Sequence, residues 1–257
     1  MAESNALSRQ FDEAAQLYDE VRPRYPEEIV EHIIAFAAPP AHARILEVGC
    51  GTGQMTVPFA KRGYAVIALD HGERLAALAA QHCQPYPRVR VVPCAFEAWQ
   101  DTAGSYDVFL SAQAFHWIEP PYGLARAAKL LKIGGTIALV WTLDQSAGSA
   151  FWQATQPIYE RYNPVTSSAR PQAGHLTYAH ALRTSRQFVE VQEVRRAWTK
   201  RYSGEEYLKL LWTFSDHRAM PEPSRSRFFK AISRVIAHMG GEVLRDYETL
   251  ALLAKKG

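Results

Sequence analysis

Ile45-Leu-Glu-Val-Gly-Cys-Gly-Thr-Gly-Gln-Met55 decides the fold, because an apolar run enters a glycine-rich turn and then a helical pattern. Glycine lets the backbone approach a ligand closely, and the start of a helix offers free N–H donors. The alternative is an ordinary tight turn between a strand and a helix. Glu47 indicates a cationic ligand, because its carboxylate would repel the pyrophosphate of a dinucleotide.

Short apolar runs alternate with helical patterns from about residue 27 to residue 142. This alternation predicts an α/β protein with a doubly wound parallel sheet. The expected strands are Arg44–Val48, Ala65–Leu69, Val89–Val92, Tyr106–Leu110 and Thr136–Trp141, and the expected helices include Glu73–Gln81 and Pro121–Leu131.

The pattern changes after Trp141. The segment Asp144–Thr184 is mixed and rich in aromatic residues and proline, which predicts a helical cap in place of another strand–helix unit. Alternating apolar residues then predict an antiparallel pair of strands at one side of the sheet. These strands are expected over Phe188–Val194 and Glu242–Leu253, with helices over Gly204–Trp212 and Ser224–His238 between them.

A second acidic residue, Asp70, ends the second expected strand, 17 residues after Gly53. Doubly wound folds place a carboxylate there to bind ribose hydroxyls. The alternative is that Asp70 caps the helix that follows Gly72. Together with the glycine turn, its position favours a ligand that contains adenosine.

The composition excludes several classes of protein. The chain has 257 residues, 47% of them hydrophobic and 21% charged, and a net charge of +3, which does not indicate a nucleic-acid groove. Cys50, Cys83 and Cys94 form no Cys-x-x-Cys pair, and His175 and His180 are five residues apart, so no metal site is expected. The polar start and the lack of a long apolar run predict a cytoplasmic protein without a membrane span.

The glycine motif together with Asp70 resembles the signature of class I S-adenosylmethionine-dependent methyltransferases. Three further stretches are similar to the small-molecule branch often called type 11. They are Phe11–Pro26, with its Tyr-Asp and Arg-Pro elements, Ser111-Ala-Gln-Ala-Phe-His-Trp117 and Leu131-Lys-Ile-Gly-Gly135. The glycine motif is shared across the superfamily, whereas the other elements are narrower.

The resemblance implies a Rossmann-like sheet of seven strands whose last strand is antiparallel. It also implies a single methyltransferase domain over residues 1–257. Within it we expect an N-terminal helical lid (1–36), a cofactor-binding core (40–142), a cap with the sixth strand (143–240) and the last strand (241–257).

The resemblance also implies how S-adenosylmethionine would be bound. Glu47, Gly49, Gly51 and Gly53 would line the methionine part, Asp70 would hold the ribose, and Ala95 and Phe96 would flank the adenine. Many relatives have Asp at the position of Ala95, where it accepts a hydrogen bond from the adenine amino group. In this chain the backbone must accept that bond, or the bond is lost.

Gln113, His116 and Trp117 follow the fourth expected strand, at the sheet edge where open α/β folds bind ligands. Gln113 is expected to contact the cofactor. Aromatic faces favour a cationic sulfonium, so Trp117, Tyr18 and Phe11 are candidate walls of the site. His116 is a candidate general base, and the alternative is that it only hydrogen-bonds the cofactor or a lid.

Arg22 is expected to bind the carboxylate of the cofactor or of a substrate, and the alternative is a surface arginine that fixes the turn at Pro23. The sequence therefore predicts methyl transfer to oxygen, nitrogen or carboxylate of a small molecule, with no nucleic-acid or membrane partner. The alternatives are a nucleic-acid methyltransferase and a non-catalytic protein that binds an adenosyl cofactor. Glu119-Pro-Pro-Tyr122 does not support the former, because it lies well past the strand end.

Overall fold

A computed structural model describes residues 14–163 and 174–257 of the chain. The chain forms two compact units. The core unit contains Arg24–Thr142, Ala173–Arg196 and Thr249–Gly257, and the second unit contains Met1–Pro23, Leu143–Gln172 and Ala197–Glu248. Each unit is described separately below.

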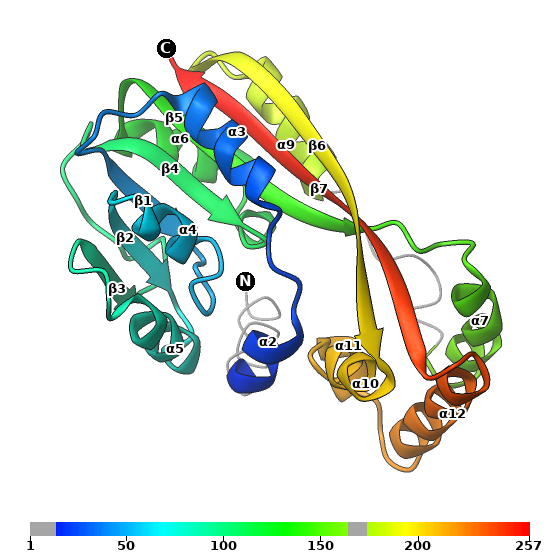
Figure 1. The fold of residues 1–257 in the computed structure, drawn as a ribbon. Helices are drawn as coiled ribbons and strands as arrows, with labels where there is room; N and C mark the ends of the chain where they lie inside the picture. Colours follow the sequence, from blue (N-terminus) through cyan, green and yellow to red (C-terminus); the bar gives the residue numbers. More distant parts are fainter. Residues whose placement is uncertain (1–13, 164–173) are drawn as a thin grey trace. The chain divides into compact units, whose positions relative to one another are not determined.

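The strands form one seven-stranded sheet in the order β3-β2-β1-β4-β5-β7-β6 (Figure 1). β1 to β5 are parallel to one another, and β7 runs opposite to both of its neighbours, β5 and β6. This confirms the predicted doubly wound sheet with an antiparallel last strand. The strands are β1 (Arg44–Val48), β2 (Ala65–Asp70), β3 (Val89–Pro93), β4 (Tyr106–Ala112), β5 (Leu131–Asp144), β6 (Phe188–Ser203) and β7 (Glu242–Lys256).

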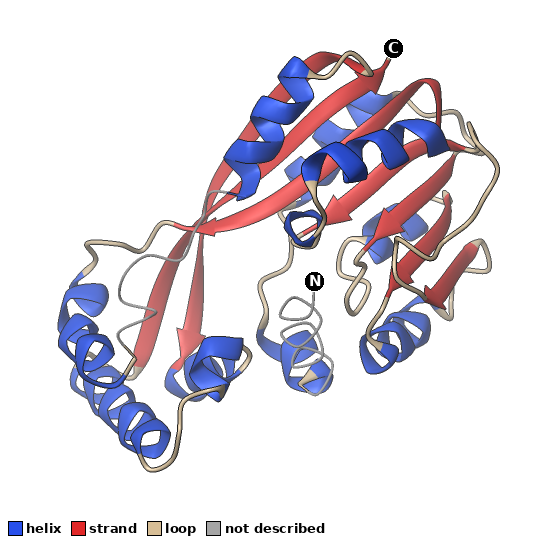
Figure 2. Cartoon of the chain, turned by 180° about the vertical axis from the view of Figure 1, so that it is seen from behind, coloured by secondary structure: helices blue, strands red, loops and turns tan. Residues whose placement is uncertain are grey.

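Helices flank both faces of the sheet in the core unit. Figure 1 shows α3 in front of the sheet with α6 and α9 behind it, and Figure 2 shows the opposite side. The helices of the core unit are α3 (Glu27–Ala37), α4 (Thr56–Lys61), α5 (Glu73–Cys83), η1 (Phe115–Trp117, a 3₁₀ helix), α6 (Pro120–Leu130) and α9 (Gly174–Thr184).

The register of the parallel strands places their carboxyl ends at one edge of the sheet. Glu47 pairs with Ala68 of β2 and with Leu110 of β4, so the loops that follow β1, β2 and β4 start at the same level. The sheet order reverses between β1 and β4. Ligands of open α/β sheets bind at such a reversal, outside the carboxyl ends of the strands.

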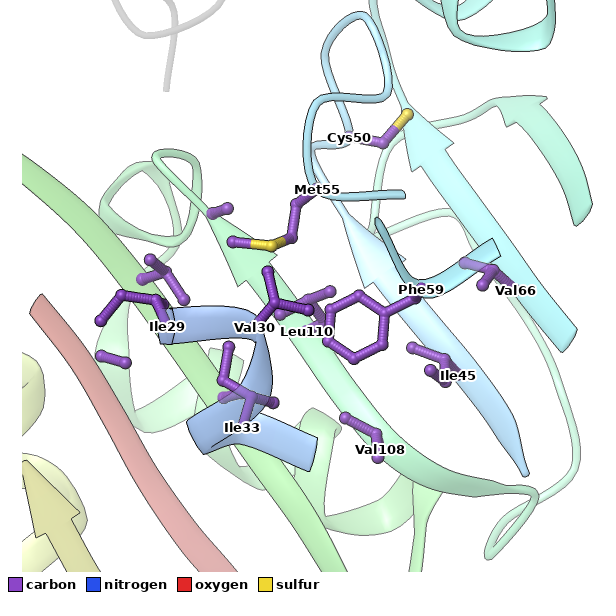
Figure 3. Packing of buried hydrophobic residues seen from close by; sticks show 14 of the residues in the cluster. Ile29, Val30, Ile33, Ile45, Cys50, Met55, Phe59, Val66, Val108 and Leu110 are labelled. Carbon is purple, nitrogen blue, oxygen red and sulfur yellow. The ribbon is translucent and has the colours of Figure 1, made fainter. Parts of the chain in front are cut away.

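Apolar side chains fix α3 and α4 on the sheet. Ile29, Val30 and Ile33 lie on one face of α3, as the helical period requires, and are fully buried against the strands (Figure 3). Phe59 of α4 fills the space beside Val108 in the same cluster. Burial of each such side chain contributes about 1.5–3 kcal/mol to the stability of the folded protein. The cluster therefore stabilises the part of the sheet from which the loops after β1 and β4 begin.

The second unit has its own apolar cluster, formed by Tyr207, Leu210 and Leu211 of one helix with Phe228 and Ile232 of another. Its helices are α2 (Ala15–Val21), α7 (Ala150–Tyr162), α10 (Gly204–Trp212), α11 (Ser215–Arg218) and α12 (Ser224–His238). Ser203 begins α10 with a capping box, in which it exchanges hydrogen bonds with Glu206.

A buried arginine joins the strands of the second unit to its helices. Arg245 of β7 forms an ion pair with Asp144 and donates to the Tyr207 hydroxyl at 2.7 Å. The rings of Tyr207 and Tyr247 lie 5.6 and 5.8 Å from the guanidinium. These contacts compensate for the burial of the charge.

Most of the predicted elements are confirmed, but several boundaries differ. β5 already begins at Leu131, with an irregular register before Thr136, so α6 ends one residue earlier than expected. β6 continues to Ser203, well past the expected end at Val194. α3 belongs to the predicted lid but packs within the core unit. Only the part of the lid before Arg24 lies outside the core unit. The predicted division into lid, core, cap and last strand stays a prediction.

Candidate functional site

The glycine turn after β1 has a backbone that other residues rarely adopt. Gly49, Gly51 and Gly53 have φ angles of +71°, +57° and +84°. A Cβ atom at Gly49 would lie only 2.1 Å from the Cβ of Ala114, which follows β4. The loops after β1 and β4 therefore meet directly at the reversal of the sheet order, and only glycine permits this approach.

Asp70, at the end of β2, is bound to the glycine turn. Its carboxylate accepts hydrogen bonds from the backbone N–H groups of Gly51 and Gly72, both at 2.8 Å. The N-cap of α5 is Gly72, and the helix has no side-chain capping bond, so the alternative that Asp70 caps the helix is wrong. These two bonds of Asp70 instead fix the glycine turn at Gly51 and the chain that leads into α5. A carboxylate accepts about four hydrogen bonds, so these contacts are compatible with ribose binding.

Glu47 is enclosed by the protein and is only 1% exposed. One carboxylate oxygen accepts a hydrogen bond from the Thr56 hydroxyl at 2.6 Å, and the other, Oε1, has no partner among the described residues. Burial raises the pKa of Glu47 to about 8, with a smaller contribution from the charge of Asp70. Glu47 thus joins the end of β1 to the start of α4 through the hydrogen bond from Thr56. Its predicted contact with the cofactor stays a prediction.

The end of β4 turns sharply at Gln113, which has a φ angle of +57°. Its backbone N–H donates to the carbonyl of Val140, and its side-chain amide donates to the carbonyl of Thr142 at 2.9 Å. Ser111 donates to the carbonyl of Val48 at 2.7 Å. These bonds join the ends of β1, β4 and β5 and direct the following residues over the sheet edge.

His116 and Trp117 lie in η1, immediately after this turn. Trp117 is 43% exposed, and the His116 ring lies 4.9 Å from it. Nε1 of Trp141, on β5, donates a hydrogen bond to Nδ1 of His116 at 3.4 Å. The residue as a whole is exposed, whereas desolvation of its imidazole by the surrounding protein lowers its pKa to about 4. At neutral pH its imidazole is therefore uncharged.

Helix α9 supplies further neighbours of η1. Tyr178 donates a hydrogen bond to the carbonyl of Ile118, and its ring lies 5.1 Å from that of Phe115 and 6.0 Å from that of Trp141. His175 lies 6.5 Å from Trp141, is 8% exposed, and its Nδ1 has no partner among the described residues. The helical spacing of His175 and Tyr178 places both on one face, which is the signal that could have identified them.

The structure separates Ala95 from Phe96. Ala95 is exposed beyond the end of β3, as expected for a residue at the site. The ring of Phe96 is buried, 5.4 Å from Phe109, and its carbonyl accepts a hydrogen bond from Arg126. Phe96 is therefore part of the core, and its predicted contact with adenine stays a prediction.

Tyr18 and Arg22 belong to the second unit. Arg22 donates to the Thr213 hydroxyl at 2.9 Å, and its guanidinium lies 4.3 Å from the Phe214 ring and 5.0 Å from the Tyr18 ring. These contacts join α2 to the end of α10. The predicted roles of Tyr18 and Arg22 in cofactor binding stay predictions, and Phe11 lies outside the described residues.

The core unit fits the chemistry of S-adenosylmethionine. The turn at Gly49 has no space for a side chain, because Ala114 occupies that space, and its predicted contact with the cofactor stays a prediction. Asp70 offers a buried carboxylate that ribose hydroxyls can use. Among the described residues, no group of three or more His, Cys, Asp or Glu side chains is placed to hold a metal ion.

Comparison with known proteins agrees with this arrangement. Residues 45–135, which span β1 to the start of β5, match the family described as methyltransferase domain. An uncharacterized methyltransferase of Mycobacterium tuberculosis (strain H37Rv) is 35% identical over 144 residues. The middle of the chain is therefore similar to a methyltransferase domain. The match to the mycobacterial methyltransferase spans 55% of this chain and 56% of the relative.

Other methyltransferases are similar over shorter stretches or in fold alone. The ubiquinone biosynthesis O-methyltransferase of Caulobacter vibrioides is 35% identical over 115 residues, 44% of this chain and 45% of the relative. The structure of a putative type II methyltransferase from Anaeromyxobacter dehalogenans superimposes with a TM-score of 0.64 at 23% identity, covering 91% of this chain and 97% of the other. Within residues 14–163 and 174–257, no helix is both long and apolar enough to cross a membrane.

Proposed function

We propose that this protein transfers a methyl group from S-adenosylmethionine to oxygen, nitrogen or carboxylate of a small molecule. The observation that carries the proposal is the junction of Asp70, the glycine turn and the loop after β4 at the reversal of the sheet order. The name of the Caulobacter relative, an O-methyltransferase of ubiquinone biosynthesis, supports a small-molecule acceptor.

The bound cofactor supplies an electrophilic methyl group on a cationic sulfur. In the proposed function Asp70 binds the ribose, while the backbone of Gly49, Gly51 and Gly53 contacts the methionine part. Gln113 holds the end of β4 and places His116 and Trp117 toward the acceptor. Methyl transfer needs in-line placement more than covalent help, and such placement can supply about 7–11 kcal/mol of the barrier reduction.

The aromatic side chains support the same assignment. A sulfonium is attracted to an aromatic face, with an energy of about 0.5–2 kcal/mol that depends on desolvation. Trp117 is the aromatic residue of η1 that keeps a large exposed surface. We assign it to the wall that faces the methyl group or the acceptor.

Titration calorimetry tests the cofactor first. S-adenosylmethionine and S-adenosylhomocysteine should bind, and NAD should not. Binding of NAD alone would contradict the proposal. Release of S-adenosylhomocysteine is then measured over a metabolite library that contains carboxylic acids, phenols and amines, with RNA and DNA as further acceptors. Turnover confined to nucleic acid would support the nucleic-acid alternative, and binding without turnover on any acceptor would support the non-catalytic one.

A further inference from the structure

We propose that His116 acts as a neutral hydrogen-bond donor through Nε2 and not as a general base, and that Trp141 is the positioning residue that fixes it in this form. The inference rests on the proposed function and deepens it. It implies an acceptor whose nucleophilic atom carries no proton at neutral pH and that accepts a hydrogen bond. A carboxylate is the chemical class that fits both conditions.

The hydrogen bond from Trp141 determines which nitrogen of His116 carries the proton. An indole N–H can only donate, so Nδ1 of His116 must be the acceptor and must be unprotonated. A neutral imidazole then carries its single proton on Nε2. Because the Nδ1 lone pair is occupied by Trp141 and Nε2 already carries a proton, the ring has no free lone pair with which to remove a proton from a substrate.

Trp141 is held firmly enough to impose this tautomer. It lies on β5, is only 4% exposed, and packs against the rings of Tyr178 and His175 from α9. The hydrogen bond from Tyr178 to Ile118 fixes the other end of η1. Trp141 of β5 therefore contacts the His116 ring directly, and α9 fixes the residue that follows η1, while His116 remains exposed.

The protonation state of His116 agrees with this geometry. Burial lowers its pKa to about 4, so its neutral form dominates at pH 7. The neighbouring elements carry these titratable side chains: Glu119, Tyr122, Arg126 and Lys129 at the start of α6 and along it, and His175, Tyr178, His180 and Arg183 on α9. A base with so low a pKa is inefficient near neutrality, whereas an imidazole N–H remains a good donor there.

A carboxylate acceptor makes a base unnecessary. Carboxylic acids have a pKa near 4, so they are ionised at pH 7. A carboxylate oxygen forms the new bond to the methyl carbon while the carbon–sulfur bond breaks, and the electron pair of that bond stays on sulfur. The products are a neutral methyl ester and a neutral thioether, and no proton has to leave. In the proposed step Nε2–H of His116 binds the second carboxylate oxygen and orients the acid.

Nitrogen NMR of the protein labelled with ¹⁵N-histidine tests the tautomer without any ligand. The protein has nine histidines, and the signal that is lost in His116→Gln identifies His116. The wild type at pH 7 should show a neutral ring protonated at Nε2. Trp141→Phe should convert it to a mixture of tautomers, whereas Trp152→Phe, at an exposed tryptophan of the second unit, should leave it unchanged. A ring protonated at Nδ1, an imidazolium at pH 7, or an unchanged tautomer in Trp141→Phe would overturn the proposal.

Three substitutions of His116 test the role in catalysis with the acceptor found in the screen. The amide nitrogen of Gln can occupy the place of Nε2, whereas that of Asn lies near Nδ1 and Ala has no donor. His116→Gln should keep turnover within about 10-fold of the wild type, while His116→Asn and His116→Ala should raise KM about 10- to 100-fold. A base role would instead lower kcat about 10²- to 10⁴-fold in all three variants.

The two proposals fail in different ways. If no acceptor is methylated, the proposed function is wrong, but the NMR experiment still decides the state of His116. If the screen finds an acceptor whose methylated atom must lose a proton, and His116→Gln is as inactive as His116→Ala, methyl transfer stands and the donor role of His116 is wrong.

Discussion

Glu47→Gln should make the protein more stable than the wild type at high pH, because an ionised Glu47 is costly in its buried position. Its pKa of about 8 in the folded protein lies well above the ordinary 4.5 of an unfolded chain. The folded state therefore binds this proton more tightly than the unfolded state does. The contribution of protonated Glu47 to the unfolding free energy is fully present below pH 4.5 and is lost as the pH rises to 8.

The magnitude follows from the distance between the two pKa values, since each pH unit corresponds to about 1.4 kcal/mol. The wild type should lose up to about 5 kcal/mol of unfolding free energy between pH 4.5 and pH 8 through this group alone. Glutamine has no charge to lose. Its constant cost, an amide group beside Thr56 with one buried atom unpaired, is the same at every pH.

Urea unfolding at pH 5, 7 and 9 measures the effect. The unfolding free energy of Glu47→Gln relative to the wild type should rise by about 3–5 kcal/mol from pH 5 to pH 9. Glu97→Gln, at an exposed glutamate of the same unit, is the matched control and should follow the wild type at every pH. If the unfolding free energies of Glu47→Gln and the wild type changed with pH in the same way, burial would not raise the pKa of Glu47 as described.

Three further predictions concern the same structure. Asp70→Ala should weaken binding of S-adenosylmethionine about 10- to 100-fold by calorimetry, and an unchanged Kd in the folded variant would remove Asp70 from the site. Gly49→Ala should lower the unfolding free energy by at least about 2 kcal/mol, because it strains the backbone and overpacks the contact with Ala114. The control Gly63→Ala should cost about 1 kcal/mol, because Gly63 has a φ of +82° but no atom near the added Cβ. Equal losses in the two variants would contradict the close contact between the loops. Arg245→Met should lower the unfolding free energy, measured with urea, by about 2–3 kcal/mol. This is less than the loss of a fully buried ion pair would cost, because Asp144 is partly exposed. A loss below about 0.5 kcal/mol would show that the ion pair contributes nothing to stability.

The sequence predicts the sheet because the buried strands consist mainly of apolar residues. Ile45, Leu46 and Val48 are all buried, so β1 was recognisable without tertiary information. The sequence also located the residues at the carboxyl ends of the strands, since strand ends are fixed once the strands are known. β6 was underestimated because its second half, from Arg195 to Ser203, mixes charged and aromatic residues without a simple period.

The chemistry of individual side chains could not be read from the chain. Trp141 and His116 are 25 residues apart, and nothing local indicates that the indole N–H reaches Nδ1 of the imidazole. The sequence assigns Glu47 to a cationic ligand because its carboxylate would repel a pyrophosphate, but it does not show that the Thr56 hydroxyl of the next helix binds this carboxylate in the interior. Phe96 follows a strand end, but its ring turns inward to Phe109, a direction that depends on the packing of the opposite face.

The division into two units affects how the protein can fold during synthesis. The chain passes between the units five times, after residues 23, 142, 172, 196 and 248. Residues 249–257 return to the core unit as the end of β7, which lies between β5 and β6 in the sheet. Until the ribosome has released these residues, β5 and β6 have no strand between them and present unpaired backbone edges, which invite aggregation. The core unit is therefore expected to complete its sheet only after residues 249–257 have left the ribosome. Before that point, the nascent chain should depend on chaperones more than a protein whose strands pair in the order in which they are synthesised.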